Sequence, residues 1–188
     1  FLSAADGEQV LKLAAKEEFE YAEVDELGTV VEKDYTPYHI NQVLALKLVN
    51  RDAIAQADLK IVVDAVNSVG GVVIPALLRA LGVKEIIELN CEPTGHFAHN
   101  PEPIPENLTQ IAAKMKESRA DLGIVVDPDV DRLALISENG EMFGEEYTLV
   151  AVADYVLKHT PGNTVSNLSS SRALKDVTEA YGQQYHAA

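Results

Sequence analysis

Three aspartates at alternate positions are the residues of this 188-residue sequence best suited to chemistry. Asp127, Asp129 and Asp131 follow a short apolar, β-branched run, and Arg132 comes immediately after them. Carboxylates this close together repel one another unless a cation lies among them, and hard divalent ions such as Mg²⁺ take oxygen ligands of this kind. The guanidinium group of Arg132 is a planar donor suited to phosphate. The pattern therefore predicts a metal site beside a phosphate group.

The segments around this acidic loop (residues 127–131) alternate between strand and helix patterns. Short apolar runs predict four strands, at residues 60–66, 85–89, 122–126 and 133–137. Helical patterns follow the first two strands, at residues 72–81 and 105–118, and a third closes the unit, at residues 146–159. Such an order predicts an α/β fold, with a three-layer, mostly parallel sheet and helices on both faces. Ligands gather at the carboxyl ends of such strands, where the acidic loop lies.

The flanking segments predict three parts of a longer protein. An acidic amphipathic helix is expected at residues 7–23, a linker at 24–38 and a second helix at 39–49; after Pro161-Gly162 a strand, a helix and a strand follow, at 164–168, 172–181 and from 184. We therefore expect a domain tail with linker (residues 1–34), a main domain (35–160) and the start of a further domain (161–188). The chain begins with Phe1 and stops after a strand-like segment, so we expect a fragment.

Composition narrows the classes of partner. The net charge of −15 disfavours nucleic acid, whose binding relies on Lys and Arg, and equally disfavours an anionic membrane surface. Apolar runs fall short of the roughly 18 residues that a membrane-spanning helix needs. Cys91 is the single cysteine, which rules out an internal disulfide and favours a reducing, cytoplasmic setting. We expect Cys91 to be a small buried residue and not a reactive one.

Two other metal-dependent classes have a similar acidic pattern. In an EF-hand, Asp127, Asp129, Asp131 and Glu138 would occupy positions 1, 3, 5 and 12, but Arg132 stands where the loop needs glycine. The Asp-x-Asp opening of haloacid-dehalogenase-type phosphatases would make Asp127 the nucleophile and Asp129 the acid/base. That class also needs a later lysine and a second acidic pair, for which this sequence offers only poor candidates. A non-catalytic module with a structural cation stays open as well.

Residues 35–188 resemble the α-D-phosphohexomutases, the phosphoglucomutase/phosphomannomutase superfamily. The metal loop of that superfamily has the form Asp-x-Asp-x-Asp-Arg at a strand end, and residues 127–132 match it at every fixed position. Four further segments resemble its glycine turn, its proline-rich connection and the passage into its third domain: residues 66–71, 93–108, 140–146 and 167–174.

The resemblance implies four domains around one cleft and a phosphoryl transfer between C1 and C6 of a hexose phosphate, glucose and/or mannose, through a phosphoserine and a bisphosphorylated intermediate. Asp127, Asp129 and Asp131 would hold Mg²⁺, and Arg132 would stabilise the phosphate as a catalytic residue. No Ser-His-Asn-Pro-like nucleophile segment occurs in this sequence. We therefore expect the parent protein to be a mutase and this fragment to be inactive alone.

Other polar residues have simpler explanations. We expect His96 and His99, in the connection at residues 90–105, to be loop histidines satisfied by backbone or water. Gly70-Gly71 is expected to serve turn geometry, because no phosphate-cradling pattern surrounds it. Residues 169–171, all serine, are expected to cap the helix that follows.

Overall fold

The computed structural model describes residues 2–188, apart from the side chain of Glu145. The chain divides into two compact units, Phe1–Asp34 and Tyr35–Ala188. No helix among the described residues is both long and apolar enough to cross a bilayer.

The first unit contains one helix and one short 3-10 turn. Helix α1 (Ala4–Lys16) begins at Ser3, whose hydroxyl accepts the amide of Asp6, and the carboxylate of Asp6 accepts the amide of Ser3 in return. The 3-10 turn η1 comprises Val24–Glu26. The predicted helix at residues 7–23 was wrong at both ends: α1 ends at Glu17, in the left-handed conformation with φ 52°. Several acidic residues follow α1 in the sequence. Negative charge is unfavourable at the C-terminal end of a helix, so these residues do not extend α1.

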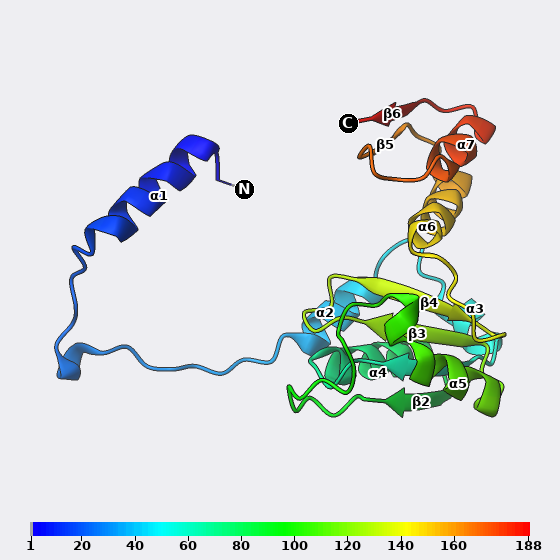
Figure 1. Cartoon of the computed structure of the whole chain (residues 1–188), viewed down its shortest axis with the longest axis horizontal. Coiled ribbons are helices and arrows are strands. Elements are labelled where there is room, and N and C mark those ends of the chain that lie inside the picture. Colours follow the sequence, from blue (N-terminus) through cyan, green and yellow to red (C-terminus); the bar gives the residue numbers. More distant parts are fainter. Residues whose placement is uncertain (1) are drawn as a thin grey trace. The chain divides into compact units, whose positions relative to one another are not determined.

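The second unit is built on a four-stranded sheet in the order β2-β1-β3-β4 (Figure 1). The strands are β1 (Lys60–Asp64), β2 (Glu85–Leu89), β3 (Leu122–Val126) and β4 (Leu133–Ser137). Strand β1 pairs in parallel with both β2 and β3, whereas β4 pairs antiparallel with β3. Only residues 127–132 join β3 to β4, and a parallel crossover needs a dozen or more residues. The α/β fold with a mostly parallel sheet is confirmed.

Helices cover both faces of this sheet. On one face, Val62 and Ile136 of the sheet share a core with Ile111 and Met115 of α5 (Thr109–Ser118), which follows the short η2 turn (Pro105–Asn107). On the other face, Ile61 and Val63 pack with Leu78 of α4 (Gly70–Leu81). The alternation of neighbouring β1 residues between the two cores follows from the pleat of the strand.

Several helix boundaries differ from the sequence prediction; the helix expected at residues 105–118, for example, is the η2 turn followed by α5 from Thr109. The helix expected at residues 39–49 is α2 (Thr36–Leu44), which begins and ends earlier than expected. A separate helix, α3 (Arg51–Gln56), follows, and Asn50 caps it by accepting the amide of Ala53. Helix α4 begins at Gly70, two residues earlier than expected. At Gly71 the helix lies so close to the end of β2 that a Cβ atom would stand 1.9 Å from the carbonyl oxygen of Cys91. Only glycine fits at this crossing.

The last elements are α6 (Glu145–His159), β5 (Thr164–Ser166), α7 (Ala173–Ala180) and β6 (Tyr185–Ala187). Strands β5 and β6 pair in parallel and α7 packs against both of them, as a βαβ unit requires, and α7 also packs against α6. The expected serine cap was wrong, because the N-cap residue of α7 is Arg172; the hydroxyl of Ser171 nevertheless accepts the amide of Ala173.

Candidate metal centre

The carboxyl ends of three parallel strands bring polar residues to one edge of the sheet. Asp64 ends β1, Asn90 follows β2 and Asp127 follows β3. Asp64 and Val125 are register partners, so the ends of β1 and β3 lie next to each other. This is the edge at which ligands bind in open α/β sheets, and the acidic loop lies on it.

The three aspartates of the acidic loop converge. One carboxylate oxygen from each of Asp127, Asp129 and Asp131 lies within 4.8 Å of the others. The loop curls around Asp127, whose carbonyl accepts the amide of Val130 at 3.2 Å and whose Oδ1 accepts the amide of Arg132 at 3.0 Å. Val130 has a positive φ of 62°, which turns the chain back toward β4. The fold thus brings together the three residues that the sequence predicts as metal ligands.

The charges in this cluster perturb one another. Burial acts to raise the pKa of Asp127, but hydrogen bonds from the amide of Arg132 and from the neighbouring carboxyl groups outweigh it and hold that pKa below its ordinary value. The hydrogen bond with Asp127, together with the negative charges of Asp129 and Asp127, raises the pKa of Asp131. Asp127 is only 7% exposed, whereas Asp131 is exposed. The carboxyl group with the lowered pKa is therefore the buried one, and the carboxyl group with the raised pKa lies at the surface. A bound cation would offset the repulsion between these negative charges.

The donor set fits a hard divalent ion. All three ligands offer carboxylate oxygens, which suit Mg²⁺ and Ca²⁺, and neither cysteine nor histidine belongs to the group. Two of the three aspartates are exposed, so further ligand positions open toward solvent. An ion here would be free to take a phosphate oxygen.

Arg132 stands at the edge of the cluster and is itself 57% exposed. Its Nη1 atom lies 3.5 Å from Oε1 of Glu102, and its Nε atom lies 3.9 Å from Oδ2 of Asp127 and 4.0 Å from Oδ1 of Asp131. A cavity of about 310 Å³ opens beside these groups, lined by Asn100, Pro101, Glu102, Asp127, Pro128 and Arg132. The guanidinium group therefore faces a space in which an anion can meet both it and an ion on the aspartates.

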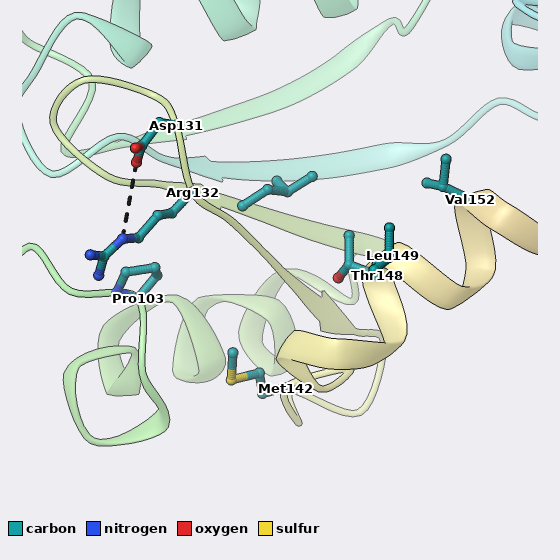
Figure 2. A pocket seen from close by; sticks show the side chains of 8 residues that line it. Pro103, Asp131, Arg132, Met142, Thr148, Leu149 and Val152 are labelled. Carbon is teal, nitrogen blue, oxygen red and sulfur yellow. Dashed lines mark ion pairs between the residues drawn. The ribbon is translucent and has the colours of Figure 1, made fainter. Parts of the chain in front are cut away.

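A second cavity, of about 400 Å³, adjoins the same arginine on an apolar side. Figure 2 shows it between the acidic loop and α6, with Thr148, Leu149 and Val152 on the helix and Met142 below. The guanidinium group of Arg132 extends toward Pro103 in this view, and the dashed line marks its ion pair with Asp131. In this view Pro103, from the proline-rich connection, and Asp131 lie on opposite sides of the guanidinium group.

The turn after β1 and the start of α4 contact the acidic loop and the end of β3. The hydroxyl of Ser68 donates to the carbonyl oxygen of Pro128 at 2.6 Å. A Cβ atom at Gly70 would stand 2.5 Å from Cγ2 of Val126, so the turn approaches β3 as closely as glycine allows. The expectation that Gly70-Gly71 serves turn geometry was wrong, because both residues belong to α4 and glycine is needed there for close packing.

Sequence reasoning missed three residues at this edge. Asp64 is a fully buried carboxylate, His99 contacts it, and Glu102 pairs with Arg132. The expectation for His99 holds for one ring nitrogen only: Nδ1 donates to the carbonyl of Asn100 at 2.8 Å, but Nε2 lies 3.2 Å from Asp64 Oδ2. The sequence signal that could have pointed to Asp64 is an aspartate that directly follows a run of β-branched residues at the end of β1.

Cys91 is half-buried and not fully buried as expected, but its environment does disfavour reactivity. Burial, the main cause, and the charges of Glu88 and Asp64 raise its pKa from 9.0 to about 11. The thiolate, which is the reactive form, is therefore scarce at neutral pH.

The comparison with known proteins agrees with this architecture. The family model for phosphoglucomutase/phosphomannomutase, alpha/beta/alpha domain II, matches residues 37–140. The chain belongs to this family. The match contains all four strands of the sheet and the acidic loop, and it confirms the resemblance to the phosphohexomutases that the motifs predicted.

Relatives and solved structures of this family extend the match beyond the sheet. A probable phosphoglucosamine mutase from Methanopyrus kandleri is 34% identical over 88% of this chain and 36% of its own length, and a phosphoglucomutase/phosphomannomutase from Thermococcus kodakarensis is 35% identical over 92% and 38%. A crystal structure of a phosphoglucomutase/phosphomannomutase family protein from Burkholderia thailandensis superposes with a TM-score of 0.78 at 26% identity, over 99% of this chain and 39% of that one. The chain thus spans little more than a third of these family members.

Proposed function

We propose that this chain is the metal-binding portion of a phosphohexomutase, an isomerase that moves a phosphoryl group between C1 and C6 of glucose and/or mannose phosphates. Residues 35–160 would form its second domain, residues 161–188 the start of its third, and residues 1–34 the tail of its first with a linker. The observation that carries the proposal is the convergence of three carboxylates at the carboxyl end of β3, with Arg132 beside them.

In this proposal each residue of the acidic loop has a distinct role. Asp127, Asp129 and Asp131 hold Mg²⁺, which when bound neutralises phosphoryl charge and polarises the P–O bond. Asp127 is the buried anchor, since the amide of Arg132 fixes its carboxylate. The guanidinium group of Arg132 donates to phosphoryl oxygens and stabilises their charge. Phosphoryl transfer depends chiefly on such positioning and electrostatic stabilisation.

The remaining parts of the reaction belong to other segments of the parent protein. The phosphoserine through which the group passes, and the loops that bind the sugar and its distal phosphate, have no counterpart in this sequence. We therefore expect no turnover from this chain alone. Binding, and not activity, is the property to measure.

Calorimetric titration of Mg²⁺ into this chain, with and without inorganic phosphate, tests the proposal. We expect weak binding that phosphate strengthens and that Asp129→Ala abolishes. Asp25→Ala is the matched control, because it removes the same charge from an exposed aspartate in the first unit. Tight binding of Ca²⁺ over Mg²⁺ that ignores phosphate would instead indicate a structural cation module and contradict the catalytic role.

A further inference from the structure

A buried carboxylate lies behind the metal centre and takes no part in it. The side chain of Asp64 is 1% exposed. Its Oδ1 atom accepts the amide of Val66 at 3.0 Å, and Nδ2 of Asn90 lies 3.2 Å from both of its oxygens. A polar side chain removed from water this completely needs hydrogen-bond partners, and the ends of β1 and β2 supply them.

The remaining partner of Asp64 comes from the proline-rich connection. His99 is 15% exposed, and its Nε2 atom lies 3.2 Å from Oδ2 of Asp64. Its Nδ1 atom donates to the carbonyl of Asn100, so both ring nitrogens have partners and the ring has one orientation. We call this pair the Asp64–His99 clasp. It attaches a segment that otherwise lacks helix and strand to the central strand of the sheet.

The residues after the clasp reach the arginine of the acidic loop. Asn100 Oδ1 accepts the amide of Glu102 at 3.2 Å, and the carbonyl of Glu102 accepts Nδ2 of Asn107 at 2.8 Å. The backbone of Glu102 is therefore held at both its amide and its carbonyl group. Its carboxylate then meets Nη1 of Arg132 at 3.5 Å.

We propose that Asp64, His99 and Glu102 are positioning residues of the metal centre: the clasp sets Glu102 opposite Arg132, and Glu102 holds the guanidinium group toward the cavity in which phosphate binds. The inference rests on the proposed function and adds to it three residues outside the acidic loop. None of the three is placed to touch the ion. They act through Arg132, which has a long side chain that is more than half exposed and would otherwise sample many rotamers.

Charge alone predicts the opposite outcome, which makes the inference testable. Glu102 adds a negative charge beside a site for an anion, so by Coulomb's law its neutralisation should strengthen phosphate binding. If Glu102 instead positions Arg132, its neutralisation should weaken phosphate binding. An exposed ion pair of this kind is worth up to about a fivefold change in affinity.

The experiment measures phosphate affinity by calorimetry at a fixed, high Mg²⁺ concentration for variants of this chain. Glu102→Gln removes the charge, and Glu102→Asp keeps the charge but shortens the side chain. His99→Gln opens the clasp. Glu106→Gln and His96→Gln are matched controls, because both are exposed side chains of the neighbouring segment. The ¹H–¹⁵N signal of Arg132 Nε, assigned with Arg132→Lys, reports the guanidinium environment without any metal.

We expect about a three- to fivefold loss of phosphate affinity in Glu102→Gln, Glu102→Asp and His99→Gln, with a shifted Arg132 Nε signal and Mg²⁺ affinity within about twofold. The two controls should match the unaltered chain. Phosphate affinity that is unchanged or higher in Glu102→Gln, while the unaltered chain binds metal and phosphate, would overturn the positioning role alone. An unaltered chain that binds neither would overturn the proposed function, and this inference with it.

Discussion

Replacing Gly71 by alanine should destabilise the second unit, although alanine is the better helix former. In a helix interior, alanine is favoured over glycine by about 1 kcal/mol, which is an upper bound for Gly71 because it is the second residue of α4. At Gly71, however, the added Cβ would stand 1.9 Å from the carbonyl oxygen of Cys91 and 2.5 Å from its carbonyl carbon. Both are backbone atoms, so no side-chain rotation relieves the overlap.

The displacement that this overlap requires sets the expected size of the effect. Real Cβ contacts essentially never fall below 3.0 Å, so α4 and the end of β2 must separate by about 1.1 Å (3.0 minus 1.9). Overpacking of this kind costs typically about 1–3 kcal/mol, and a rigid backbone neighbour places Gly71 at the upper end of that interval. After the gain in helix propensity is subtracted, we expect a net loss of about 2 kcal/mol.

Urea unfolding followed by circular dichroism measures this loss as a change in midpoint at constant slope. Gly162→Ala is the control, since nothing lies within 4 Å of its added Cβ and its φ is not positive. That variant should stay within about 0.5 kcal/mol of the parent chain. A loss below about 1 kcal/mol for Gly71→Ala would refute the argument, because the helix and strand would then not be packed as rigidly as the geometry implies.

Charge and packing elsewhere lead to three further expectations. The raised pKa of Asp131 means that the folded state binds more protons than the unfolded state, so stability falls as pH rises through it, and Asp131→Asn should raise the urea midpoint of the metal-free chain at pH 7. Mg²⁺ affinity should decline on acidification through that same raised pKa, with protons released on binding; calorimetry in two buffers of different ionisation enthalpy measures them, and no release would contradict the assignment. Ile111→Ala should cost about 2–5 kcal/mol in urea unfolding, because Ile111 is fully buried, whereas Leu46→Ala at an exposed position should change little.

The acidic loop could be predicted because its signal is local. Residues 122–126 are apolar and the charges follow at alternate positions, so strand, loop and ligands all appear within a dozen residues. The antiparallel β4 also follows from the short connection after that loop. Family membership was predictable for the same reason, since the motif is contiguous.

The support of the loop could not be predicted because its contacts depend on register. Asp64 and His99 are 35 positions apart, and Glu102 and Arg132 are 30 apart (132 minus 102), so each pair meets only after β1, β2 and β3 have aligned. Helix ends were also predicted poorly. The boundary of α1 depends on the left-handed Glu17, and hydrophobic periodicity carries no information about such a residue.

The ligands of the proposed ion lie on one tight turn between two hydrogen-bonded strands, whereas the partner of Arg132 comes from a segment without strand or helix. Segments of these two kinds open independently in native-state hydrogen exchange, and irregular segments open at lower free energy. Local opening of residues 90–105 would therefore release Glu102 while the β3–β4 hairpin stays closed. Cation capture would persist through such an excursion, and anion recognition would lapse until the segment closed again.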